Sequence, residues 1–189
     1  MEEKKLFNKI LDESIEKKLL ISIYDNRSDT DKFSVGYVIT HFNDSVLLHS
    51  VDKYSQYSGY ELRPIEDIFK IGQTTEYNNN LDITYSESPF LLHNEMIQTI
   101  SEKESGISAI IEFCFQNKVL LKTYFSYGDQ ISGFIKEIND DYFLIDSYYI
   151  DGSYEGTYLV QKSNISLIDF DSENEKKLER LINKNKNPK

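Results

Sequence analysis

Hydrophobic residues near the start of the chain recur at the spacing of one face of an amphipathic helix. This face is formed by Leu6, Phe7, Ile10, Leu11, Ser14 and Ile15. The same spacing returns 100 positions later, on a face formed by Ile107, Ile110, Ile111, Cys114 and Phe115. The pattern therefore predicts two equivalent helices, one at the start of each half of the chain.

Short apolar runs separated by turn residues follow each predicted helix, which is typical of β-strands. The strands expected in the first half are 19–24, 36–41, 46–51, 60–63 and 65–71. Those expected in the second half are 119–124, 133–138, 143–149, 157–160 and 164–168. Asn43-Asp44 and Asp140-Asp141 lie between the second and third strands of each set, and both residue types tolerate the backbone angles of tight turns. We therefore predict a turn-forming role for Asp44 and Asp141.

The two halves align without a gap over 36–71 and 133–168, with Gly36 matched to Gly133. The identical positions are mainly apolar or glycine, where a fold restricts residue type most strongly. The alignment also pairs two copies of the pattern Tyr-x-Gly-x-x-Leu. Its glycines, Gly59 and Gly156, are predicted to adopt positive φ in a turn just before a strand.

These patterns predict a mostly β protein with helices, of the α+β class. It would contain two repeated units, each an N-terminal helix plus a small five-stranded bent antiparallel barrel, because closure removes the exposed edges of short strands. The predicted divisions are a first unit at 1–71, a linker with an extra helix at 72–105, a second unit at 106–170, and a C-terminal helix with a basic tail at 171–189.

Two helix starts are predicted outside the repeats, and a linker is predicted before the first of them. The run 73–80 is polar and indicates a linker. Ser88-Pro89 resembles an N-cap followed by proline at the first helical position, with a buried stripe at Leu92, Met96 and Ile100. Ser172 and Glu175 form a capping-box pattern.

Composition narrows the classes of partner. The chain of 189 residues carries a net charge of −11, and both predicted units contain more acidic than basic residues. Such a surface repels phosphate backbones, so nucleic acid is not the expected partner. The sequence contains no apolar stretch near the roughly 18 residues of a membrane span and no signal-peptide core at Met1 to Lys5, so we expect a cytoplasmic protein without membrane contact. The lone Cys114 excludes an intrachain disulfide and is expected to be a buried thiol.

The order of helix, strand, strand opening with glycine and turn containing aspartate resembles the Sm-like family. The opening glycines stand in Gly36-Tyr37-Val38 and Gly133-Phe134-Ile135. The resemblance covers 6–71 and 106–168 and implies a helix capping a bent, SH3-like five-stranded barrel. It also implies RNA binding as an alternative function. However, Leu48 and Ile145 stand where the family's RNA site has asparagine, and its Arg-Gly pair is replaced by Arg63-Pro64 and Val160-Gln161.

Candidate catalytic and metal-binding groups are sparse. The histidines are His41, His49 and His93. In the predicted hairpin, His41 lies opposite Val46 and His49 opposite Val38, so the two rings point to opposite faces and cannot share a metal ion. No nucleophile–base pair or phosphate-binding glycine loop is present. We therefore expect no catalytic residues, metal or cofactor, and an enzyme of unrecognised type is the third alternative.

Tyrosine is the strongest functional indication, with 14 copies, many of them after the third predicted strand of each half. The candidate surface consists of Tyr54, Tyr57, Tyr60, Tyr148, Tyr149, Tyr154 and Tyr158. These side chains either pack half-buried on a barrel flank or form a recognition surface for a protein or peptide, since tyrosine is enriched in interface cores. The leading hypothesis is a non-enzymatic interaction or regulatory module, whose barrel edge strands can also pair with a second copy of the chain.

Overall fold

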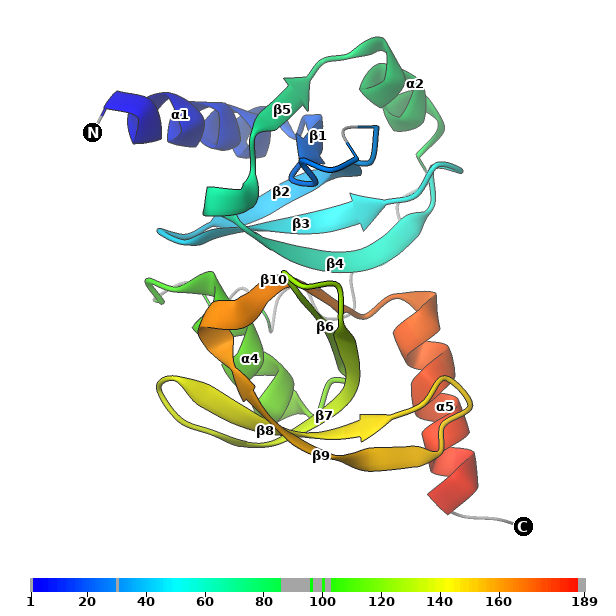
Figure 1. The fold of residues 1–189 in the computed structure, drawn as a ribbon. Helices are drawn as coiled ribbons and strands as arrows, with labels where there is room; N and C mark the ends of the chain where they lie inside the picture. The colour runs from blue at the N-terminus through cyan, green and yellow to red at the C-terminus, as the bar shows by residue number, and fades with distance from the viewer. Residues whose placement is uncertain (1, 30, 86–95, 97–99, 101–102, 187–189) are drawn as a thin grey trace.

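The computed structural model describes residues 2–29, 31–85, 96, 100 and 103–186. These residues form an α+β protein, with four helices within the described ranges and ten strands in one antiparallel sheet, which confirms the predicted class (Figure 1). The elements of the first half are α1 (Glu2–Lys17), β1 (Leu20–Tyr24), β2 (Ser34–His41), β3 (Ser45–Val51), β4 (Tyr57–Pro64), the 3-10 turn η1 (Ile65–Asp67), β5 (Lys70–Gln73) and α2 (Glu76–Thr84). Those of the second half are α4 (Gly106–Asn117), β6 (Leu121–Phe125), β7 (Gln130–Ile138), β8 (Tyr142–Tyr148), β9 (Tyr154–Gln161), η2 (Lys162–Asn164), β10 (Ile165–Phe170) and α5 (Glu173–Lys186).

The two halves contribute their strands in the same spatial order. The sheet runs β5-β1-β2-β3-β4-β10-β6-β7-β8-β9, so in each half the fifth strand lies beside the first. The halves are joined where β4 pairs with β10. Among the described residues β5 and β9 are the two edges of an open sheet, so closure of each half into a barrel stays a prediction.

Equivalent glycines hold equivalent places in the two halves. Gly36 lies opposite Ser50 in the β2–β3 pair, and Gly133 lies opposite Ser147 in the β7–β8 pair. A Cβ atom would lie 2.5 Å from the His49 carbonyl oxygen at Gly36 and 1.9 Å from the Asp146 carbonyl oxygen at Gly133. Only glycine permits so close a backbone approach, which explains why the repeat keeps it.

The largest hydrophobic core crosses the junction between the halves. Tyr60 and Leu62 of β4 share one buried cluster with Phe113 of α4 and with Ile168 and Phe170 of β10. In Figure 1 the strands of the second half curve around α4, while α1 lies against the first half. Burial of this apolar surface therefore stabilises the β4–β10 pairing as well as the interior of the second half.

The predicted helix faces were correct except at two positions. Leu6 is exposed on α1, and on α4 the buried phenylalanine is Phe113, whereas Phe115 is 36% exposed. The cause in α4 is tertiary, because Phe113 packs on Phe170 at a ring distance of 6.2 Å. A single amphipathic stripe does not predict this second contact.

The prediction of one strand over 65–71 was wrong. Pro64 ends β4, and the chain turns through η1 before β5 begins at Lys70. β5 then pairs with β1, with Ile71 opposite Ile23. Proline lacks the N–H that would continue the strand ladder, which favours the turn at this point.

The polar run 73–80 was predicted to be a linker, and this prediction was wrong, because the run contains the start of α2. Thr75 caps this helix, and its hydroxyl oxygen accepts a hydrogen bond from the Asn78 N–H at 3.1 Å. The buried Asn78 amide donates to the carbonyl oxygens of Leu20 and Gly72, each at 3.1 Å, and accepts from the Ser22 hydroxyl at 2.6 Å. These hydrogen bonds of Asn78 therefore connect α2 to β1 and β5.

Two further predictions concern the helix expected after Ser88-Pro89 and the capping box at Ser172 and Glu175. Ser88, Pro89 and Leu92 lie outside the described residues, whereas Met96 and Ile100 are buried, as predicted. The capping box before α5 is confirmed, because the Ser172 N–H donates to Glu175 Oε2 at 3.0 Å and the Asn174 N–H donates to Ser172 Oγ at 3.1 Å.

Candidate functional site

The histidines of the first half are separate, and the predicted register was wrong for one of them. A β-bulge between Val38 and Thr40 places His49 opposite Tyr37 rather than opposite Val38. His41 Nε2 lies 2.9 Å from Asp12 Oδ1, whereas His49 is buried and stacks on the Tyr57 ring at 4.5 Å. His93 lies outside the described residues. In the part of the chain that the structure describes, no three His, Cys, Asp or Glu side chains are grouped to hold a metal ion.

The candidate tyrosines divide into packing residues and surface residues. Tyr60 is buried and stacks on Phe170 at a ring distance of 5.2 Å, and the Tyr57 hydroxyl donates to Asp171 Oδ2 at 2.8 Å. Burial raises the pKa of both phenols. Tyr148 is buried in a cluster with Leu120 and Ile182. These three tyrosines therefore join elements of the protein to one another.

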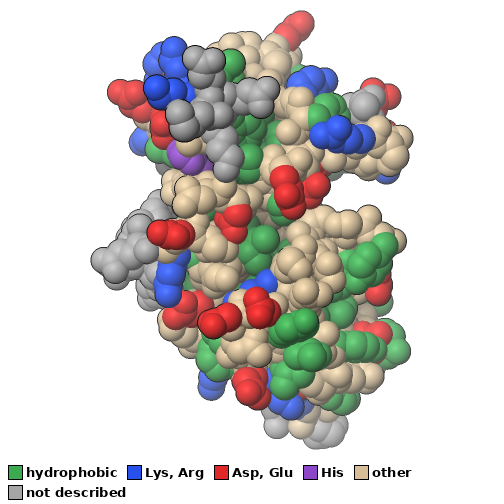
Figure 2. Space-filling model, turned by 60° about the vertical axis from the view of Figure 1, so that its left-hand side comes forward, with side chains coloured by type: hydrophobic (Ala, Val, Ile, Leu, Met, Phe, Trp, Pro, Cys, Tyr) green, Lys and Arg blue, Asp and Glu red, His purple; other side chains and the backbone are tan. Residues whose placement is uncertain are grey.

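The other four candidate tyrosines are exposed, and three of them lie near one edge of the sheet. Tyr54 lies alone after β3, whereas Tyr149, Tyr154 and Tyr158 lie along the outer end of β8 and on β9. Two exposed aliphatic residues, Ile150 and Leu159, lie near this group, and Leu159 follows Tyr158 in β9, so these two side chains point to opposite faces of the strand. We call the set Tyr149, Ile150, Tyr154, Tyr158 and Leu159 the β9 surface. Figure 2 shows hydrophobic side chains gathered on the second half of the molecule. Such gatherings mark interaction sites more often than scattered apolar residues do.

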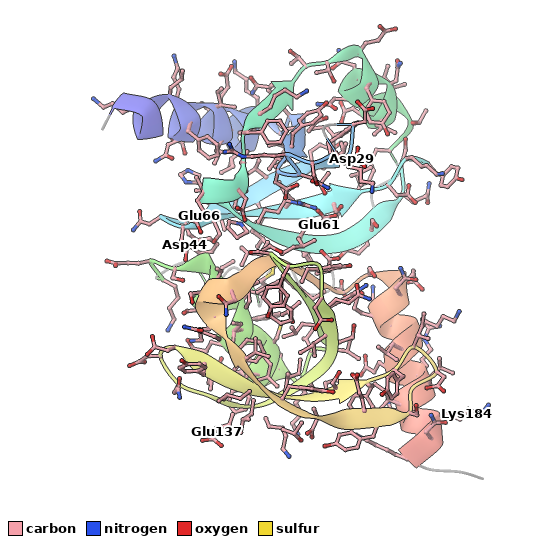
Figure 3. All side chains as sticks on the ribbon, in the orientation of Figure 1. Asp29, Asp44, Glu61, Glu66, Glu137 and Lys184 are labelled. Atoms are coloured by element: carbon pink, nitrogen blue, oxygen red, sulfur yellow. The ribbon has the colours of Figure 1, made fainter. Side chains whose placement is uncertain are left out.

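Both predicted turn aspartates lie in their hairpins, but their side chains differ in use. The Asp44 carbonyl oxygen accepts from Ile65 N–H at 2.8 Å, and the Asp141 carbonyl oxygen accepts from Lys162 N–H at 2.9 Å. Asp44 also caps α4, since its Oδ1 accepts from Gly106 N–H at 2.9 Å and its Oδ2 accepts from the Ser105 hydroxyl at 2.6 Å. Asp44 is labelled in Figure 3, close to the start of that helix. Sequence reasoning missed this cap because the partners are about 60 residues apart.

The glycines of the repeated Tyr-x-Gly-x-x-Leu pattern have positive φ, but they do not lie in turns. Gly59 has φ of 95° and Gly156 has φ of 155°. They lie inside β4 and β9, next to the register shifts between His49 and Val51 and between Ser147 and Tyr148. The positive φ therefore belongs to a bulge within each strand, where glycine is favoured for the same steric reason.

A polar cleft of about 470 Å³ lies between α5 and the sheet, near the β9 surface. Its lining includes Tyr149, Ile150 and Glu155 at one end, and Glu61 and Asp169 at the junction of the halves. The lining also includes Glu175 and two lysines, Lys122 and Lys177, so the β9 surface continues into a cleft that carries both signs of charge. This arrangement offers apolar contact and polar groups of both charges to the same bound molecule.

A buried ion-pair network stabilises the junction beneath this cleft. Glu61, labelled in Figure 3, accepts hydrogen bonds from Arg63 Nε at 3.0 Å and from the Ser50 hydroxyl at 2.6 Å. Arg63 also pairs with Asp25. Burial alone would raise the pKa of Glu61, but the charge of Arg63 and these hydrogen bonds lower it below its usual value.

Asp169 lies directly opposite Glu61 in the β4–β10 pair, so two carboxyl groups are cross-strand neighbours. Burial and the negative charge of Glu61 raise the pKa of Asp169 to about 7, although the Tyr124 hydroxyl donates to it. The folded protein therefore holds this proton at pH values where the unfolded chain, with a pKa near 4, has released it. The resulting stability is fully present below about pH 4 and is lost as the pH rises towards 7.

Replacing Asp169 with asparagine is expected to remove this dependence. The amide keeps an acceptor for Tyr124 and carries no charge at any pH, so D169N should be more stable than the native chain at pH 8, by about 1 to 3 kcal/mol. Urea unfolding at a series of pH values measures this difference. It should shrink towards zero near pH 4, and a constant difference over the whole range would contradict the assigned titration.

Comparisons with known proteins assign no family to this chain, so the class of protein is argued from the geometry described above. The chain matches no known protein-family model and no curated protein. Within the described ranges, no helix combines the length and the hydrophobicity required to cross a membrane. Cys114 is buried, and this burial raises the pKa of its thiol, which disfavours the reactive thiolate.

Proposed function

We propose that this protein is a non-enzymatic interaction or regulatory module, built from tandem Sm-like units, that binds a protein or peptide through the β9 surface. The observation that carries the proposal is the exposed group Tyr149, Ile150, Tyr154, Tyr158 and Leu159, of which the last three lie on the edge strand β9 and the first two in the loop before it. Exposing so much apolar area to water is unfavourable unless a partner covers it.

The repeated strand order supports the Sm-like part of the proposal. Each half places its fifth strand beside its first and opens its second strand near a glycine that meets the third. Each half would then close into a small barrel capped by its helix. The proposal concerns a protein partner rather than RNA, because the net charge of −11 on the chain disfavours contact with a phosphate backbone.

A capture experiment with surface variants tests this function. The full chain, immobilised and exposed to native lysate, should retain protein rather than RNA, and the double variant Y154S/Y158S should lose most of that protein. The matched control is Y127S, which removes a comparably exposed tyrosine from the β6–β7 turn. Melting temperatures of both variants should stay near that of the native chain. Retention of RNA, or equal losses in both variants, would reject the proposal.

A further inference from the structure

The equivalent strands β4 and β9 differ in their neighbours, because β4 is covered by β10 and β9 is an edge strand among the described residues. In β4, Leu62 lies opposite Ile168 of β10 and Tyr60 lies opposite Phe170. Leu62 is 1% exposed in this arrangement, whereas its equivalent in β9, Leu159, is 66% exposed. The alignment of the two halves makes the outer edge of β9 a copy of an edge that already holds an antiparallel strand. Within the described residues, β9 pairs only with β8.

The bulge glycines indicate the same difference. A Cβ atom on Gly59 would lie 2.8 Å from the carbonyl oxygen of Phe170, the last residue of the docked strand. On Gly156 the nearest atoms would be ring atoms of Tyr158, at 3.8 Å. The space that the backbone of β10 fills beside β4 is therefore open beside β9.

The two turn aspartates also differ in whether their side chains contact another element. Asp44 caps the α4 helix that packs beside β4, whereas the side chain of its equivalent, Asp141, is exposed. Three features of one docking arrangement are thus repeated around β9, namely an apolar leucine, a glycine-lined gap and a turn carboxylate. None of the described residues makes there the contacts that β10 and α4 make beside β4.

A second copy of this chain does not fit this place through the equivalent elements of its first half. The residues that dock on the first half are Phe170, Phe113 and Gly106, and their equivalents at the other end of the molecule are Gln73, Glu13 and Leu6. Polar groups would then replace the two phenylalanines that fill the junction. Leucine would replace a glycine whose Cβ would already lie 2.2 Å from Ser45 Oγ.

The charges around Tyr158 indicate which kind of side chain a strand paired with β9 would place opposite this tyrosine. Tyr158 occupies the place equivalent to Glu61, where β10 presents Asp169. The carboxylates of Glu155 and Asp129 lie close enough to act on the Tyr158 phenol. A basic side chain opposite Tyr158 would meet these charges and the face of an aromatic ring, both of which favour a cation.

We propose that β9 binds an extended segment of a different protein as an added antiparallel strand. This segment carries apolar residues opposite Leu159 and Thr157 and a basic residue opposite Tyr158. The inference rests on the proposed function, since it specifies how the β9 surface holds its partner. Main-chain hydrogen bonds supply affinity in such strand addition, and the alternate side chains supply specificity.

A peptide copied from the strand that docks on β4 provides the probe. It contains residues 163–171 of the chain with D169K, so that lysine stands between the positions of Ile168 and Phe170. Fluorescence anisotropy should show saturable binding to the full native chain below 500 µM. Binding should weaken at least tenfold in L159D, which alters an already exposed side chain, and should be unchanged in Y127S.

Two altered peptides test the mode of binding. The peptide with I168D and F170D should lose binding, and so should a peptide N-methylated at the amides that face β9, because methylation removes a strand donor without changing a side chain. Equal binding of the N-methylated peptide, no binding of the unmodified peptide at 500 µM, or a concentration-dependent dimer abolished by L159D would overturn strand addition by a different protein. Capture of protein that is lost in Y154S/Y158S while the peptide fails would refute strand addition and leave the proposed function standing.

Discussion

Replacing Gly59 with valine is expected to lower the free energy of unfolding by about 3 kcal/mol or more. The backbone at Gly59 has φ of 95°, which a β-branched residue tolerates worst. The added Cβ would also lie 2.8 Å from the Phe170 carbonyl oxygen and 2.9 Å from the Ser172 backbone nitrogen. Strain and crowding therefore add at the strand pair that joins the two halves. Urea unfolding followed by circular dichroism measures the loss.

Two other glycines separate these contributions. Gly128 has φ of 88°, and among the described residues a Cβ there would meet no atom within 4 Å, so G128V should show the backbone strain alone, about 1 to 2 kcal/mol. Gly156 also has open space, so G156V should resemble G128V. If G59V costs no more than these two variants, the crowding assigned to the β4–β10 junction is wrong.

The repeat and most strands were predictable because their signals are local. Apolar alternation, turn residues such as Asp44 and Asp141, and the close-approach glycines each reflect constraints that act within one hairpin. The bulge after Val38 was not predictable from spacing, since one extra residue moves His49 opposite a different partner without changing the apolar pattern. The buried role of Asn78 was also missed, because a polar run looks the same whether solvent or backbone satisfies it.

Which tyrosines form a surface could not be read from the repeat. Tyr57 and Tyr154 occupy equivalent positions of the repeat, yet the Tyr57 hydroxyl donates to Asp171 across the junction and Tyr154 is exposed. The difference arises because β10 covers β4 while the same edge of β9 lies free among the described residues. Tertiary pairing of the two halves therefore decides burial, and no pattern confined to one copy contains that information.

Arg63 is the residue whose loss should affect the junction most. Its guanidinium pairs with Glu61 at 2.8 Å and with Asp25, and it is almost fully buried. R63L would leave both carboxylates without their cation while Asp169 still lies opposite Glu61. Removing one partner of a buried ion pair typically costs about 3 to 5 kcal/mol, since the remaining charge is desolvated and uncompensated. We expect a loss of this size at pH 7.

The pH dependence of R63L should identify the cause of this loss. In the native chain Arg63 lowers the pKa of Glu61, and this contribution is present above pH 4.5 and disappears as the pH falls through the lowered value. In R63L the same carboxyl would gain a proton more readily, because burial then acts without a compensating cation. The deficit should therefore be largest near pH 7 and smaller near pH 4. R180L, which removes an exposed arginine 3.5 Å from Glu173, is the matched control and should cost less than about 0.5 kcal/mol at either pH. A deficit in R63L that does not change with pH would attribute the loss to packing rather than to the unpaired carboxylates.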